Sequence, residues 1–147
     1  MNYVAILALL ATLQAGTSQD TSTDIPSCRV TVPDRPDAFY GDDKLSVALP
    51  WRDGTVVFQP RGAGMVLPDG ALSMKFGWNR GVVGRLAING RRLDATAAPL
   101  RANIPDGYGD TGFQASALIF PTPGCWEVTG KVGEAALTFV TRVIKIS

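Results

Sequence analysis

The sequence contains no histidine. Imidazole is the usual general base of serine and cysteine hydrolases and a common ligand of transition metals. Its absence excludes Ser–His–Asp triads, Cys–His nucleophile pairs and imidazole metal centres. The G-x-S-x-G, phosphate-loop, dinucleotide-binding and zinc-spacing motifs are also absent. Among hydrolases, one that uses carboxylates stays open.

An excess of charge of one sign is also lacking. Lys and Arg number 14, Asp and Glu number 13, and the net charge is +1. Nucleic acids and anionic membranes are usually bound by a basic patch, so neither is expected as the main partner.

Long apolar runs are few, and the longest covers residues 4–13. It is too short to anchor a chain in a bilayer, and Gly16 and Ser18 suit a cleavage site that follows it. These features predict a signal peptide over residues 1–18, although no Lys or Arg precedes the run. The protein is then secreted or periplasmic and meets the membrane only transiently. The alternative is an ordinary buried strand or helix. Residues 19–27 are polar and predict a flexible lead-in.

Cysteine occurs twice, as Cys28 and Cys125. Cys28 lies too far beyond the apolar run, and too close to Pro26, to be a lipoprotein cysteine. Export and an even cysteine count favour a disulfide between the two. Two unrelated thiols are the alternative.

No stretch shows a helical apolar period of useful length. Short apolar runs instead alternate with turns rich in the 16 glycines and 10 prolines. This pattern is typical of all-β proteins, and we expect an immunoglobulin-like antiparallel β-sandwich formed by a single domain, residues 28–147.

The clearest predicted element is a closing hairpin within residues 121–146, turning at Gly133 and Glu134. One face of this hairpin is apolar and includes Trp126, and the other is polar. A register shift of one residue would exchange the two faces. The predicted pairs are Val128–Phe139, Gly130–Leu137 and Thr129–Thr138.

Three more hairpins are predicted at Asp-Gly and Asn-Gly turns. The predicted turns are Asp53-Gly54, pairing Trp51 with Val56 and Leu49 with Phe58; Asp69-Gly70, pairing Leu67 with Leu72 and Met65 with Met74; and Asn89-Gly90, pairing Leu86 with Leu93. Further strands are expected at residues 29–32, 100–104 and 113–120, the last with Phe113, Ala115, Ala117 and Ile119 on one face. Residues 33–43 are expected to form a loop, and residues 76–84 a loop or bulged strand.

Five segments are specific enough to mark a family: CRVTVP, LPDGALSMKFGWNRG, INGRRLDA, IPDGYGDTGFQA and IFPTPGCWEVTG. They resemble a family of small exported bacterial proteins of unknown function, over residues 28–146. The resemblance implies export, a compact β domain and pairing of Cys28 with Cys125. It implies no activity, and residues 29–43 depart most from the pattern.

Two glycine-containing loops carry the candidate binding residues, because glycine leaves backbone groups open to a partner and the neighbouring side chains offer aromatic rings and both charges. The loops are residues 77–81 and 105–111, and the candidates are Trp78, Asn79, Arg80, Asp106, Tyr108 and Asp110. The alternative is structural: Tyr108 packs at a corner and Arg80 pairs with a carboxylate.

Other chemistries are weaker hypotheses. Asp106 and Asp110 could bind calcium or act as an acid/base pair on a glycoside. Met65 and Met74 share a predicted face and could hold Cu(I), but filling the core is the simpler role. Arg91 and Arg92 could meet an anion. We expect no cofactor and no metal.

The prediction from the sequence is an exported, non-catalytic binding or accessory module whose partner is an unknown protein or glycan of the cell envelope. A small extracellular hydrolase that uses the carboxylates of residues 105–111 is one alternative. A structural or inhibitor-like envelope protein is the other.

Overall fold

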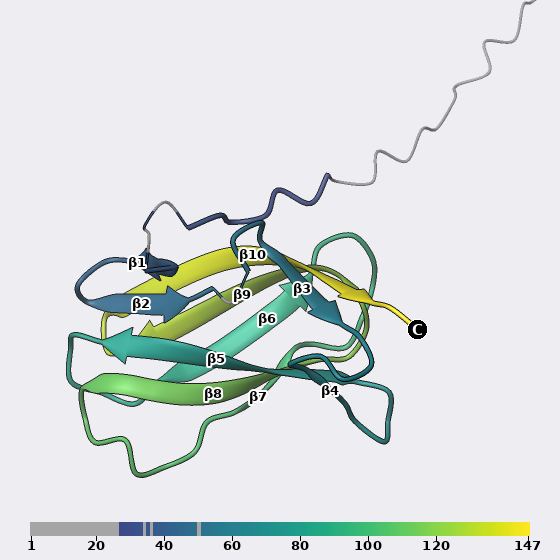
Figure 1. The fold of residues 1–147 in the computed structure, drawn as a ribbon. Coiled ribbons are helices and arrows are strands. Elements are labelled where there is room, and N and C mark those ends of the chain that lie inside the picture. Colours follow the sequence, from purple (N-terminus) through teal and green to yellow (C-terminus); the bar gives the residue numbers. More distant parts are fainter. Residues whose placement is uncertain (1–26, 34, 36, 50) are drawn as a thin grey trace, which may run out of the picture.

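Ten β-strands make up the regular structure of the computed structural model, which describes residues 27–33, 35, 37–49 and 51–147 (Figure 1). The predicted signal peptide and nearly all of the predicted lead-in lie outside these residues. Within them there is no helix, and so none long and apolar enough to cross a membrane.

The strands form two sheets. Sheet A has the order β1-β2-β5-β8-β7, with β4 also paired to β5, and it contains β1 (Phe39–Gly41), β2 (Leu45–Ala48), β4 (Met65–Val66), β5 (Leu72–Arg80), β7 (Arg101–Asn103) and β8 (Gly112–Phe120). Sheet B has the order β3-β10-β9-β6, and it contains β3 (Thr55–Phe58), β6 (Ala87–Arg92), β9 (Gly124–Val132) and β10 (Ala135–Lys145). All neighbours are antiparallel except β3 and β10, which are parallel.

The two sheets pack face to face through aromatic side chains. Phe76 and Trp78 of β5 lie against Phe139 of β10, with ring centroids 5.8 and 6.1 Å apart. Phe120 of β8 meets Trp126 of β9 edge-on at 5.7 Å. All five rings are at least 98% buried. The fold is therefore an all-β sandwich, as the sequence predicts.

The closing hairpin has the predicted register. Phe139 pairs with Val128 and is 1% exposed, whereas Thr138 is exposed and its hydroxyl lies 2.8 Å from that of Thr129. Gly130 pairs with Leu137, also as predicted. Trp126 is fully buried.

A disulfide joins Cys28 to Cys125, the second residue of β9, with the two Cα atoms 5.6 Å apart. It fastens the segment before β1 to sheet B. Residues 29–32 do not form the predicted strand, but Thr31 still bonds to β10: its N–H donates to the Val140 carbonyl, and its hydroxyl accepts from the Val140 N–H. The predicted loop over residues 33–43 contains the short strand β1.

Of the three earlier hairpin predictions, two are wrong and the one at Asp69-Gly70 is confirmed except for its register. Asp53 and Gly54 form a turn, but it carries the chain from sheet A to sheet B, so the strands on either side do not pair. The turn at residues 69–70 does join paired strands, but the register differs by one residue, with Val66 opposite Leu72. Residues 89–90 lie inside β6, a continuous strand paired with β9.

Strands β5 and β8 also differ from expectation. Residues 76–80 continue β5 and do not form a loop. In β8 the four residues predicted to share a face do so, but that face is outside, and Phe113 is 55% exposed. The core receives the other parity, Gln114, Ser116, Leu118 and Phe120. The predicted short strand at residues 100–104 is present as β7.

Candidate functional site

Arg80 ends β5 with a side chain that is only 3% exposed. Its guanidinium donates to backbone carbonyls and pairs with no carboxylate in the part of the chain that is described. The acceptors are the carbonyl oxygens of Gly84, Tyr108, Gly109, Thr111 and Gly112, at 2.9 to 3.3 Å. Five donors in a rigid planar fork suit such a ring of oxygens. Arg80 therefore fixes the loop of residues 105–111 from within, and its predicted role as an exposed binding residue is wrong.

Trp78 is also buried, with no exposed surface. Its Nε1 donates to the Ser116 hydroxyl at 3.0 Å. The prediction that Trp78 is an exposed binding residue is wrong, because β5 continues through Gly77 and turns the ring toward sheet B. Asn79, the next residue, is exposed on the outer face of sheet A.

The loop of residues 105–111 lies at the same end of the sandwich as the end of β5, at the left of Figure 1. Asp106, Tyr108 and Asp110 are all exposed. Gly107 and Gly109 have φ angles of 93° and 66°, and a Cβ at either would meet no atom within 4 Å. The loop therefore stands clear of the sheets while its carbonyls face Arg80.

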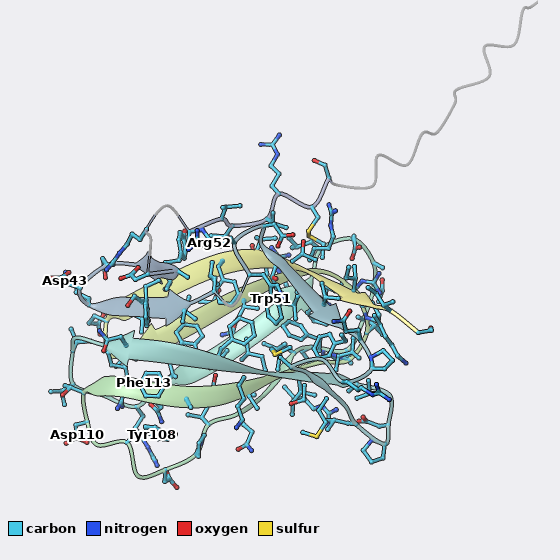
Figure 2. The ribbon with its side chains drawn as sticks, in the orientation of Figure 1. Asp43, Trp51, Arg52, Tyr108, Asp110 and Phe113 are labelled. Atoms are coloured by element: carbon cyan, nitrogen blue, oxygen red, sulfur yellow. A yellow bond between two sulfur atoms is a disulfide. The ribbon has the colours of Figure 1, made fainter. Side chains whose placement is uncertain are left out.

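Tyr108 packs edge-on against Phe113, the second residue of β8, with ring centroids 6.0 Å apart (Figure 2). The Phe113 ring covers Gly77 of β5, since a Cβ at Gly77 would lie 2.7 Å from it. Tyr108 and Phe113 are 36% and 55% exposed. They form an exposed aromatic pair that sequence reasoning missed, because Phe113 was predicted only to share a face of its strand with three other residues and was not connected with Tyr108. Gly77 and Phe113 lie on adjacent strands, but the sequence alone does not give the register of those strands. It therefore could not show that the Phe113 ring lies over Gly77.

The loop of residues 105–111 borders an open depression of about 520 Å³, which we call the end depression. Its walls come from residues 84–86 and 104–110, and Arg80 and Gln114 also line it. Arg85 and Asp106 form an ion pair across it at 3.3 Å, but both side chains are more than 90% exposed, so the pair contributes little.

Gln114 is 7% exposed and was not predicted to matter. Its Nε2 donates to the Pro105 carbonyl at 3.2 Å. Its Oε1 is enclosed and accepts no hydrogen bond from any described residue. Buried polar atoms nearly always have a partner, so this oxygen requires an explanation. An amide in a run of small and apolar residues was the available sequence signal.

The other predicted chemistries gain no support from the geometry. A calcium ion would need the loop carbonyls, three of which already accept from Arg80. Among the described residues no group of three or more acidic or cysteine side chains is placed to hold a metal. Met65 is 61% exposed and Met74 is 4% exposed, on opposite faces of sheet A. Arg91 and Arg92 pair with Glu127 and Asp94.

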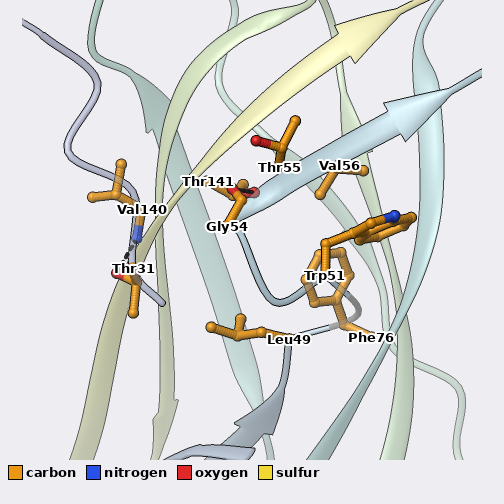
Figure 3. Close-up of a pocket in the computed structure, with 9 residues that line it drawn as sticks. All are labelled: Thr31, Leu49, Trp51, Gly54, Thr55, Val56, Phe76, Val140 and Thr141. Carbon is orange, nitrogen blue, oxygen red and sulfur yellow. Dashed lines mark hydrogen bonds between the residues drawn. The ribbon is translucent and has the colours of Figure 1, made fainter. Parts of the chain in front are cut away.

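A second hollow lies between the sheets, lined by Thr31, Leu49, Trp51, Gly54, Thr55, Val56, Phe76, Val140 and Thr141 (Figure 3). Its volume of about 10 Å³ is roughly the least that admits one water molecule. It therefore has no room for a ligand. Trp51 is half-buried against the core here.

Comparisons with protein-family models, curated proteins and solved structures found no match to this chain.

Proposed function

We propose that this protein is an exported, immunoglobulin-like, non-catalytic binding or accessory module that contacts a cell-envelope partner through the end depression and its rim. The secreted or periplasmic location rests on the apolar run at residues 4–13, and the disulfide between Cys28 and Cys125 is consistent with it because such bonds persist in oxidising compartments.

The observation that carries this proposal is the buried Arg80 with its five carbonyl acceptors. A loop held from within keeps its shape whether or not a partner is present. The side chains of Asp106, Tyr108 and Asp110 then face solvent in a fixed arrangement. Binding by such a loop costs little ordering entropy, and loops on a rigid sheet are where binding usually resides.

A hydrolase that uses the same carboxylates draws less support. Asp106 and Asp110 are both exposed, and Asp106 lies beside Arg85. A general acid usually needs an environment that raises its pKa, such as burial in an apolar pocket. The structural or inhibitor-like alternative differs from a binding module only in its partner, so identifying the partner distinguishes them.

The test is capture of envelope components by the immobilised mature protein, compared with two variants. Tyr108→Ala removes an exposed ring of the depression, and Val83→Ala removes an apolar side chain that is 72% exposed nearby but does not line it. We expect Tyr108→Ala to lose the captured component and Val83→Ala to retain it, with melting temperatures close to wild type. Equal capture by all three proteins would contradict the proposal.

A further inference from the structure

The enclosed Oε1 of Gln114 gives the end depression a chemical preference. This oxygen has no donor among the described residues, while the amide nitrogen beside it is satisfied by Pro105. If the nitrogen and oxygen of the Gln114 amide were exchanged, the amide oxygen would lie against the Pro105 carbonyl oxygen, and neither could donate. The hydrogen bond to Pro105 therefore determines which amide atom is the nitrogen. Gln114 lines the depression, so a ligand that donates a hydrogen bond toward this oxygen would satisfy it.

The charges around the depression favour a neutral donor. Arg80 and Arg85 line it, and their positive charges disfavour an ammonium or guanidinium beside Gln114. Asp106 and Asp110 line the rim, and their carboxylates disfavour an anion. The acceptors here are Gln114 Oε1 and the carboxylates of Asp106 and Asp110. All three can accept hydrogen bonds from the hydroxyl groups of a neutral polyol.

The aromatic pair supplies the other half of a saccharide site. Tyr108 both lines the depression and contacts Phe113, so the ring surface continues from the depression onto sheet A. One face of a pyranose ring is formed largely by C–H groups, which pack on the electron-rich face of an aromatic ring. The rim has groups that accept hydrogen bonds from hydroxyls, and exposed aromatic rings lie beside them. This arrangement fits a sugar, which has a polar edge of hydroxyls and an apolar face of C–H groups.

We propose that the end depression binds a neutral saccharide, with Gln114 Oε1 accepting from a hydroxyl and the Tyr108–Phe113 pair packing against the sugar ring. This inference rests on the proposed function and specifies the class of partner. The Gln114 oxygen is enclosed, so the hydroxyl reaches it through one bridging water, and the 105–111 loop stays in the place that Arg80 gives it.

The test is an NMR titration of the mature protein with cello-, malto-, xylo- and chito-oligosaccharides. We expect at least one series to shift the Gln114 side-chain amide signals and the backbone amides of residues 105–114. Gln114→Met keeps the side-chain volume and removes the acceptor, so it should weaken binding about 3- to 10-fold. It also removes the hydrogen bond to the Pro105 carbonyl, so its melting temperature is measured beside its affinity to confirm that the variant is folded. Phe113→Ala should also weaken binding, and Val83→Ala should not.

Three outcomes would overturn the inference: no shift at residues 105–114 with any of the four series, shifts confined to other faces, or equal affinities for wild type and Gln114→Met. If envelope capture still depends on Tyr108 in those cases, the saccharide is wrong but the binding module stands. If capture is also independent of Tyr108, both proposals fail.

Discussion

The guanidinium of Arg80 is charged and buried, and the backbone carbonyl oxygens that accept its hydrogen bonds are neutral. The carbonyl dipoles of five residues replace the water that a guanidinium normally keeps, and no buried carboxylate is needed. The arginine therefore takes the central position that a bound cation takes in many carbonyl-lined loops. The shape of the 105–111 loop depends on one side chain from a neighbouring strand.

Replacing Arg80 should therefore loosen the loop and destabilise the fold. Arg80→Lys supplies three donors from one nitrogen and cannot serve five carbonyls, so we expect a loss of at least about 2 kcal/mol, and Arg80→Ala should lose more. Guanidinium ion at concentrations below its denaturing range should raise the melting temperature of Arg80→Ala, but not that of wild type, relative to equal sodium chloride. Wild-type stability of Arg80→Lys would contradict the assignment.

Asp94 is the second residue whose partners determine its chemistry. Its Oδ1 accepts from Arg92 Nε at 2.7 Å and from the Cys125 N–H at 3.1 Å. These bonds, that of Arg92 first, hold the pKa of the Asp94 carboxyl below its ordinary value of 3.8. A carboxyl with a lowered folded-state pKa stabilises the fold above its unfolded-state pKa, and that contribution is lost as the pH falls through the folded-state value.

Asp94→Asn should therefore destabilise the protein by about 1 kcal/mol above roughly pH 5, and the difference from wild type should shrink as the pH falls below 3.8. Urea unfolding across this pH range measures it. Glu127→Gln is the matched control, because its partner Arg91 is 72% exposed and the pair should contribute only about 0–1 kcal/mol. A difference for Asp94→Asn that does not shrink at all as the pH falls below 3.8 would show that charge is not its source.

At the scale of elements, the β9–β10 hairpin carries the most specific packing. Gly130 of β9 lies directly against the Trp78 ring of the opposite sheet, and a Cβ there would clash with it. Gly124, at the start of β9, has a φ of 145°, and a Cβ there would run into the Arg92 side chain. Both glycines of the GCWEVTG segment are therefore required by contacts with distant residues.

The two faces of β10 should respond very differently to substitution. Phe139 is 1% exposed and contacts Phe76 and Trp78, so Phe139→Ala should cost about 3–5 kcal/mol. Thr138 is its neighbour on the exposed face, and Thr138→Ala should cost less than about 1 kcal/mol. Chemical denaturation of both variants tests this, and equal losses would mean that the register is wrong.

The sequence predicted elements well where their pairing is local. The closing hairpin joins residues near in the chain, and a two-residue turn with matched apolar faces determines its register. Asp53 and Gly54 look equally like a hairpin turn, but β2 and β3, the strands before and after it, belong to different sheets. β3 lies in sheet B because it pairs with β10, which is distant in the chain. The local sequence around Asp53 and Gly54 gives no information about that pairing.

The candidate site was predicted in position but only partly in role. The two predicted segments, residues 77–81 and 105–111, do lie at one end, although residues 77–80 belong to β5, and Asp106, Tyr108 and Asp110 are exposed there. Trp78 and Arg80 are buried, because an indole N–H and a guanidinium found acceptors inside the sandwich. Burial of polar side chains depends on such partners, which are set by the tertiary structure. Gln114 was missed for the same reason: the prediction for residues 113–120 named only the residues of the other face of the strand.

At the scale of the whole molecule, the disulfide closes a long loop. Cys28 and Cys125 are 97 positions apart, so the bond connects the segment before β1 with the closing hairpin. Restricting an unfolded chain over that distance stabilises the folded state by roughly 4–5 kcal/mol in the chain-entropy model.

A double Cys28→Ser, Cys125→Ser variant should therefore unfold at a markedly lower urea concentration than the oxidised protein. Mass spectrometry of the non-reduced, protease-digested protein should find one peptide pair that contains both cysteines. Free thiols in exported protein, or equal stability of the double variant, would contradict the pairing.

The position of β10 in sheet B also has a consequence for how the protein is made. β10 lies between β3 and β9, yet it follows all nine other strands in the chain. While the chain emerges from the ribosome, β3 has no partner until β10 is synthesised, and the inner apolar face of sheet A stays incompletely covered. Sheet B therefore cannot be completed until β10 has been made, so the native pairing forms late in synthesis or after it. Such a delay would suit the export that we propose, because a chain that crosses a membrane unfolded must not close its sandwich first.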